Sequence, residues 1–443
     1  MIEMSPELAT ILMFSSLLVG IFMGHPLAFV LGGIAVIFGV LGWGCGALSL
    51  FMSRIDGTLT DYVLVSIPLF IFMAQLLSKA GVAETIFEAV RHLFGPIRGG
   101  VAIAVVVVST LFAACTGITG AACVTMGLLA LPIMVRYGYN KRLAAGCIAG
   151  SSSLGILIPP SIMLIVMAEQ SGETVGRLFA AAIIPGLILS TLFISYILYK
   201  CWRYPDWGPA LSPEERAKVS KKQLTIMILK GTFPPVILII GVLGSIFAGI
   251  ATPTEAAGVG AFLSFVLMVA YGRFTWKDLY EVVILTARTT SMAIIILIGA
   301  TCFTGVFLGL GGGDVVRELI LGVGFGKWGT FIIMMCILFV LGMFLDWIAI
   351  IMITFPVFLP IAQSLGFDLL FFVVAVAVML QPSFNTPPFG YNLFYLKGIA
   401  PPEVSTTDIY LGAIPFWELM EVGLVICCVF PKTITWLPTI LVK

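Results

Sequence analysis

Long apolar stretches without a single charged residue recur along almost the whole sequence. Examples are 178–199, 232–254 and 256–272. Each stretch, as a helix, is long enough to cross the hydrocarbon core of a bilayer. Only 10% of the 443 residues are charged, whereas a soluble domain carries about 25%. The sequence therefore predicts an all-α polytopic membrane protein.

Several other classes of protein fit the sequence poorly. The formal net charge of +1 indicates no nucleic-acid partner. The N-terminus lacks the basic region and cleavage site of a signal peptide, so the first apolar segment is expected to remain as a helix. The adjacent cysteines Cys427 and Cys428 match neither a redox motif nor a zinc site. His25 and His92 lie where apolar segments end, so no histidine-based metal site and no cofactor is expected.

The longest polar interruption divides the chain near its middle. Between Lys200 and Lys230 there are seven Lys/Arg residues and three acidic residues. Because cytoplasmic loops carry an excess of positive charge, we expect 201–230 to be a basic cytoplasmic loop.

Two parts of the chain repeat each other at one offset of 228 residues. The matching segments are 131–133 with 359–361, 137–139 with 365–367, and 157–160 with 385–388. The loop of the first copy contains Arg136, Lys141 and Arg142, whereas its counterpart at 364–368 contains no Lys or Arg. The loops are therefore expected on opposite sides of the membrane, as in an inverted repeat, although Arg177, Arg317 and Lys327 fall on the side expected to be external.

Each copy contains two interrupted apolar segments. Small polar residues at 115–120, and the Gly and Asp of 341–346, are expected to interrupt two apolar segments. Each interruption would form the tip of a re-entrant helical hairpin, over 98–135 and 326–363. Double prolines are expected to unwind two broken helices, over 140–170 and 368–398, because proline removes an amide donor. Unwound backbone at membrane depth persists only where protein, water or a ligand satisfies it.

These four interruptions are expected to meet near the membrane midplane and to bind sodium and an anionic solute. Freed carbonyl and hydroxyl oxygens suit a hard cation, whereas the N-termini of half-helices suit a carboxylate. The alternative is that the small residues only permit close helix packing. The predicted residues are Thr116, Gly117, Thr119, Gly155, Ile158 and Pro159 for sodium site 1; Gly342, Asp346, Ser383, Thr386 and Phe389 for sodium site 2; and Ser151, Ser152, Ser153 and Asn385 for the substrate.

Two acidic residues, Asp346 and Glu255, occur in apolar surroundings or at a helix start and are expected to have different roles. Asp346 is the only acidic residue between Lys327 and Asp368, and an ionisable group inside a membrane segment is by default functional. It would bind sodium or, alternatively, only organise the hairpin tip. Glu255 follows Thr252 by three residues with a proline between them, which predicts a capping box.

Three runs resemble the large membrane subunit of tripartite ATP-independent periplasmic (TRAP) transporters. They are the Gly-Tyr to Ile-Pro-Pro-Ser run at 138–161, Ala-Thr-Pro-Thr-Glu-Ala-Ala at 251–257, and Asn-Thr-Pro-Pro-Phe-Gly-Tyr-Asn-Leu-Phe at 385–394. The resemblance covers essentially the whole chain. The sequence departs from the family pattern at the first tip, where Thr116-Gly117-Ile118-Thr119 replaces the usual Ser-Gly-Ser. The sequence therefore does not fix the ligands of sodium site 1.

The resemblance implies an elevator-type transporter of the bacterial inner membrane, coupled to two or more sodium ions. It also implies a small four-helix membrane subunit as a separate chain and a periplasmic substrate-binding protein. The expected division is scaffold helices at 1–80 and 231–310, interfacial arms at 81–97 and 311–325, transport-domain halves at 98–170 and 326–400, and transmembrane helices at 175–200 and 405–436.

Three alternative functions would have different requirements. A stand-alone sodium/dicarboxylate symporter would share the architecture but need no binding protein. An intramembrane enzyme would need a constellation of catalytic groups within the spans, which Asp346 alone does not provide. A purely structural subunit would gain nothing from paired helix breaks. The sequence does not identify the solute, because no Lys or Arg marks the tips or breaks. Sialic acids, C4-dicarboxylates and 2-oxo acids are the alternatives.

Overall fold

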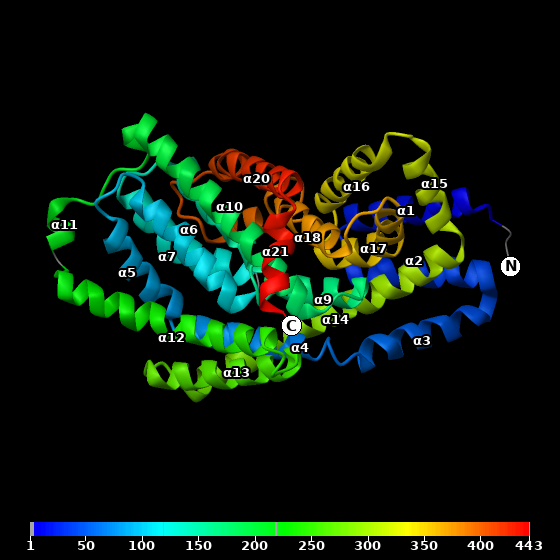
Figure 1. Ribbon diagram of the computed structural model, residues 1–443, viewed down its shortest axis with the longest axis horizontal. Helices are drawn as coiled ribbons and strands as arrows, with labels where there is room; N and C mark the ends of the chain where they lie inside the picture. Colours follow the sequence, from blue (N-terminus) through cyan, green and yellow to red (C-terminus); the bar gives the residue numbers. More distant parts are fainter. Residues whose placement is uncertain (1–3, 118, 218, 443) are drawn as a thin grey trace.

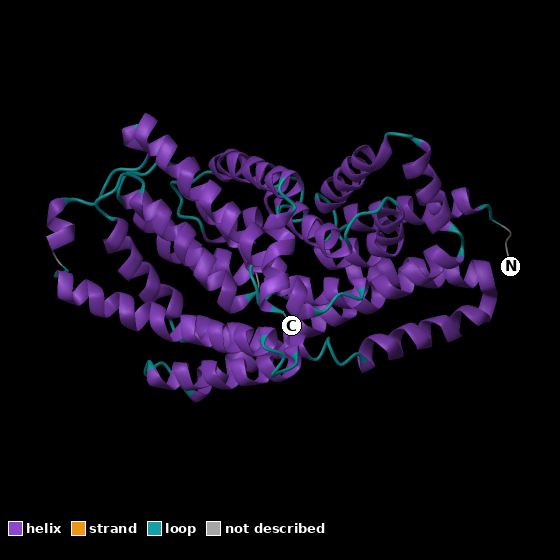
Figure 2. Ribbon diagram, in the orientation of Figure 1, coloured by secondary structure: helices purple, strands orange, loops and turns teal. Residues whose placement is uncertain are grey.

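The structure is a computed structural model that describes residues 4–117, 119–217 and 219–442. In this part of the chain every regular element is helical, as Figure 2 shows. Eight of the described helices are long and apolar enough to cross a membrane. The prediction of an all-helical polytopic membrane protein is therefore confirmed.

The helices outside the interrupted segments form a framework around them. Asparagine, serine and threonine caps begin many of the helices, since their side chains accept hydrogen bonds from the first free amides. The framework helices are α1 (Pro6–Phe22), α2 (Leu27–Trp43), α3 (Ala47–Thr60), α4 (Ser66–Lys79), α10 (Val175–Arg203), α11 (Pro213–Ala217), α12 (Lys221–Phe247), α13 (Pro253–Ala270), α14 (Trp276–Gly309), α20 (Thr406–Val429) and α21 (Lys432–Leu441).

The interrupted segments lie in the middle of the chain's two halves. In Figure 1 the α6–α7 pair lies left of the centre and the α16–α17 pair lies right of it. The first half contributes α6 (Gly100–Thr116), α7 (Thr119–Arg136), α8 (Lys141–Ser153), a 3-10 turn at Leu154–Ile156 and α9 (Ile162–Ser171). The second half contributes α16 (Gly326–Gly342), α17 (Trp347–Ser364), α18 (Leu369–Met379), a 3-10 turn at Pro382–Asn385 and α19 (Tyr391–Ile399).

The offset of 228 residues also holds for the framework. Shifting α2 from 27–43 by 228 gives 255–271, which coincides with α13 at 253–270. Their packing is reciprocal, because α13 packs on α4 whereas α2 packs on α14. The same shift takes α3 and α4 together onto α14, so one copy is a continuous helix and the other is interrupted at 61–65. The two halves are thus alike in packing but not identical.

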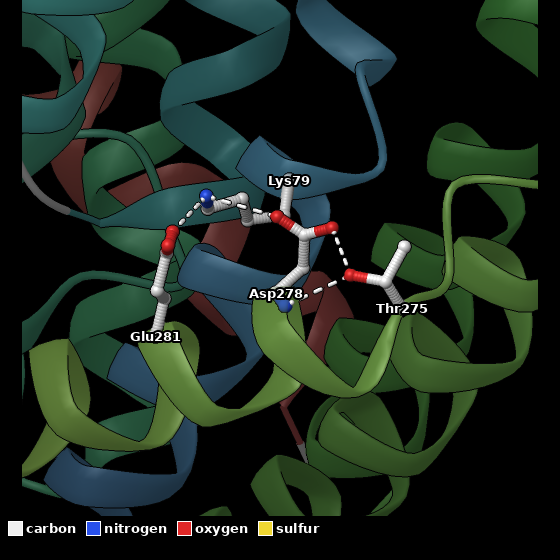
Figure 3. Close-up of polar contacts among 4 residues, drawn as sticks. All are labelled: Lys79, Thr275, Asp278 and Glu281. Carbon is white, nitrogen blue, oxygen red and sulfur yellow. Dashed lines mark hydrogen bonds and ion pairs between the residues drawn. The ribbon is translucent and has the colours of Figure 1, made fainter.

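Two short arms, α5 (Val82–Phe94) and α15 (Gly312–Gly322), follow sharp turns. Gly81 and Gly311 precede them with φ of +71° and +84°, a conformation that glycine adopts without steric cost. The chain bends by 56° between α4 and α5. Next to this bend, Lys79 bonds Asp278 at 3.2 Å and Glu281 at 2.5 Å, which fastens α4 to the start of α14 (Figure 3).

Two expected segments have different bounds in the structure. The loop expected over 201–230 ends ten residues early, because α12 begins at Lys221 after the capping residue Ser220. The last helix, expected over 405–436, is two helices. Phe430, between the two helices, has a non-helical backbone conformation, because the following Pro431 disfavours helical φ and ψ at the residue before it.

The predicted capping box at the start of α13 is confirmed. The Glu255 amide donates to the Thr252 hydroxyl at 3.3 Å, and the Thr252 amide donates to the Glu255 carboxylate at 2.8 Å. These bonds satisfy two backbone donors that would otherwise lack a partner, so Glu255 has a structural role.

Candidate functional site

The first hairpin tip packs on the broken helix of its own repeat. Gly117 joins α6 to α7 with φ of +61°, and a Cβ added there would lie 2.6 Å from the Pro160 carbonyl oxygen. The structure thus brings Gly117 next to the double proline, as predicted for sodium site 1. Thr119 begins α7 and is buried. The side chain of Thr116 lies outside the described part of the chain.

The first broken helix unwinds between Leu157 and Ser161, and Ser161 then caps α9. Gly155 lies in the short 3-10 turn just before the unwound stretch. The Ile158 side chain packs against Gly186 of α10. Any role of Ile158 at a cation site would therefore involve its main chain, as the sequence suggests for a carbonyl ligand.

The second hairpin tip makes the corresponding contact. Gly342 ends α16 directly against the side chain of Ser383, which belongs to the second broken helix. The Phe389 amide donates to the Met343 carbonyl oxygen at 3.3 Å, a second link between tip and break. The Thr386 hydroxyl donates to the Pro382 carbonyl oxygen at 3.1 Å. Gly342, Ser383, Thr386 and Phe389, four of the residues predicted for sodium site 2, thus lie where the tip meets the break.

Asp346 caps α17 at this second tip. Its carboxylate accepts a hydrogen bond from the Ile348 amide at 3.2 Å. Tyr391 and Tyr395 of α19 are close enough to interact electrostatically with the carboxylate. The Tyr395 ring also lies against Gly120 of α7, where an added Cβ would be 3.0 Å from it. Tyr395 therefore packs α19 against the start of α7.

The second broken helix holds several buried polar atoms that lack a partner. Within the described residues, Gln381 Oε1, Ser383 Oγ, Asn385 Nδ2 and Asn392 Oδ1 are buried and make no hydrogen bond. An unpaired buried polar atom costs about 1–3 kcal/mol, so four in one segment need an explanation. Three of the four are oxygen acceptors, the ligand type that a hard cation prefers.

The predicted substrate residues are placed differently from one another. Ser151, Ser152 and Ser153 are buried in α8, and their hydroxyls donate to carbonyl oxygens one helical turn earlier in the same helix. Asn385 lies in the second break, where its Oδ1 accepts from Asn392 Nδ2 at 3.4 Å. The same Asn392 nitrogen donates to the Ala149 carbonyl oxygen at 3.0 Å. Asn392 thus joins the second break to α8.

Gln381 and Asn392 are the residues of this cluster that the sequence analysis missed. Asn392 lies in the quoted run at 385–394, and Gln381 lies shortly before this run, within the expected broken helix at 368–398. The available signal was the presence of amide side chains in an otherwise apolar segment, where polar groups are costly.

Comparison with known proteins decides the family. The model of the family described as "Tripartite ATP-independent periplasmic transporter, DctM component" matches residues 14–433. The chain belongs to this family. The permease is 30% identical to the C4-dicarboxylate TRAP transporter large permease protein DctM of Vibrio cholerae, over 99% of this chain and 98% of that protein. It is 27% identical to the sialic acid TRAP transporter large permease protein SiaM of the same organism, over 94% of this chain and 96% of that protein.

A solved structure supports the fold of this permease. The YdaH transporter of Alcanivorax borkumensis superposes with a TM-score of 0.63, covering 96% of this chain and 99% of that one at 12% sequence identity. The permease is therefore a multi-pass protein of the inner membrane and a transporter component rather than an enzyme.

Proposed function

We propose that this permease imports small carboxylate solutes, driven by sodium, through elevator-type alternating access. The observation that carries the proposal is that oxygens of Gln381, Ser383 and Asn392 have no hydrogen-bond partner among the described residues, with Ser383 directly against the second tip. A sodium ion bound there would satisfy oxygens that otherwise cost stability. The carboxylate of Asp346 would offset part of the charge of the ion.

The first cation site would lie at the contact between Gly117 and Pro160. Each site would then join a hairpin tip to the broken helix of the same repeat. Sodium binding at both would hold the four interruptions together, and this closed unit would move as one body. The glycine turns before α5 and α15 would let the arms follow this movement.

Membership of the family supports the proposed solute class and partners. Relatives named for C4-dicarboxylate and for sialic acid both handle carboxylates. We expect a small four-helix membrane subunit, as a separate chain, and a periplasmic protein that delivers the solute. The alternative of a stand-alone symporter would need neither partner.

Uptake into proteoliposomes tests the proposal. Vesicles containing both membrane subunits receive candidate binding proteins, a labelled carboxylate and an inward sodium gradient. We expect uptake that stops when potassium replaces sodium and when the binding protein is left out. Uptake that is indifferent to sodium would contradict the coupling, and sodium-driven uptake without any binding protein would favour the stand-alone symporter.

A further inference from the structure

A cavity of about 520 Å³ lies away from the hairpin tips, with one wall formed by α3. The residues of this wall are three or four positions apart, so they form one face of the helix. They are Leu50, Ser53, Arg54, Gly57, Thr58 and Asp61. A volume of this size suits a small organic solute.

The other walls come from both expected domains. α14 contributes a second stripe, Leu297, Thr301, Thr304 and Leu308. Glu169 and Gln170 of α9, Met352 and Pro356 of α17, and Leu64 just before α4 complete the cavity. The Thr304 hydroxyl donates to the Met352 carbonyl oxygen at 2.8 Å. The cavity thus lies where the expected scaffold meets the expected transport domain.

Arg54 is the cationic group of this cavity. It lies in α3, and its side chain is exposed. Among the described residues, no carboxylate oxygen lies within 4.0 Å of its guanidinium. A Cβ added at Gly305 would lie 3.2 Å from Arg54 Nε, so the side chain crosses α14 where glycine leaves room. Arg54 is therefore an exposed cation on the wall of the cavity, without an acidic partner among the described residues.

Acidic groups lie at the other end of the cavity. Asp61 follows Arg54 by seven residues, which is about 10 Å along a helix. Its carboxylate accepts from the Val63 amide at 2.7 Å, in the interruption that α14 lacks. The Glu169 carboxyl group is close enough to Asp61 to interact with it. One end of the cavity is therefore cationic, and the other end is acidic.

We propose that this cavity is a second binding site for the transported solute, and that it takes a monocarboxylate whose other end carries hydroxyl groups. Arg54 binds the carboxylate through its planar guanidinium, which matches the geometry of a carboxylate. Asp61 and Glu169 accept hydrogen bonds from the solute hydroxyls. A dicarboxylate binds poorly, because its second carboxylate would face these acids. The part of this proposal that concerns transport depends on the proposed function, but the binding site does not.

Thermal unfolding of the full chain in lipid nanodiscs tests the site. The probes are sodium gluconate, which has a carboxylate and hydroxyls; sorbitol, which has only the hydroxyls; and sodium succinate, a dicarboxylate. Sodium chloride brings all samples to the same sodium concentration. A ligand that binds only the folded protein raises the unfolding temperature. We expect a saturable rise with gluconate, none with sorbitol and a much weaker one with succinate.

Two variants and a control assign the effect to the cavity. Arg54→Gln should raise the gluconate concentration that gives half of the temperature rise by at least about tenfold, because it removes a charged hydrogen-bond donor. Arg54→Lys should keep part of the response. Arg203→Gln removes an arginine at the end of α10, outside the cavity, and should respond like the unaltered protein.

The proposal is overturned if gluconate gives no rise, if Arg54→Gln keeps the full response, or if succinate matches gluconate. A failed uptake assay has a different meaning. A protein that binds gluconate through Arg54 but shows no sodium-driven uptake would contradict the proposed transport and leave this site in place.

Discussion

Gly342, at the tip of the second hairpin, lies directly against the side chain of Ser383 in the second broken helix. A methyl group on Gly342 would overlap the Ser383 hydroxyl, so the tip can approach the break this closely only with glycine. The contact joins two segments of the proposed sodium site 2.

We therefore expect Gly342→Ala to weaken sodium binding. Overpacking of this kind costs about 1–3 kcal/mol, which would displace the tip from the break. The sodium concentration for half-maximal uptake should rise about tenfold or more. Gly398→Ala is the matched control, because a Cβ there has no neighbour within 4 Å. Equal sodium dependence in the two variants would show that the tight contact is not needed for binding.

The sequence predicts the interruptions of this fold well, because their causes are local. Proline pairs and clusters of glycine and small polar residues disrupt a helix wherever they occur. The structure accordingly has helix ends at 117, between 157 and 161, at 343–346 and between 380 and 390. The duplication at one offset was equally visible, since it needs only a comparison of the chain with itself.

Other features depend on contacts between distant segments, which the sequence does not reveal. The bond from Asn392 to Ala149 joins residues 243 positions apart. Arg54 and Glu169 meet at one cavity only after the helices of both halves have packed. The local sequence marks only the tips and breaks, so it predicts neither of these long-range arrangements.

Asp346→Asn tests whether the carboxylate charge acts on sodium. Asparagine caps a helix about as well as aspartate, so the bond to the Ile348 amide should remain. We expect the sodium concentration for half-maximal uptake to rise at least about tenfold, because the opposite charge near the ion is lost.

Asp368→Asn provides the control for this change. Asp368 caps α18 through the Phe371 amide at 2.8 Å, so the variant makes the same chemical change at another cap. We expect it to keep the sodium dependence of the unaltered protein. If Asp346→Asn also kept it, the Asp346 carboxylate would only organise the tip.

Lys79→Gln tests the ion pairs that fasten α4 to α14. Lys79, Asp278 and Glu281 are each about one third to two fifths exposed, and exposed pairs contribute roughly 0–1 kcal/mol. We expect the variant to unfold at a temperature lower by at most a few degrees in low salt. The difference should shrink in 1 M potassium chloride, because salt screens exposed charges.

Thermal unfolding of the purified protein at two potassium chloride concentrations provides the measurement. Lys397→Gln, at an exposed position of α19, controls for the loss of a positive charge. A loss of stability that is large and independent of salt would mean that Lys79 stabilises the bend before α5 by packing rather than by charge.

Ser383→Ala separates a structural role of the second break from a binding role. The Ser383 hydroxyl is buried and has no partner in the part of the chain described, so its removal should leave the stability without sodium unchanged or slightly higher. If the oxygen binds sodium, the rise in unfolding temperature on adding sodium should be reduced or lost. Ser264→Ala removes a buried hydroxyl that bonds the Gly260 carbonyl oxygen at 2.8 Å, so it should lower stability but keep the sodium response. A full sodium response in Ser383→Ala would place the ion elsewhere.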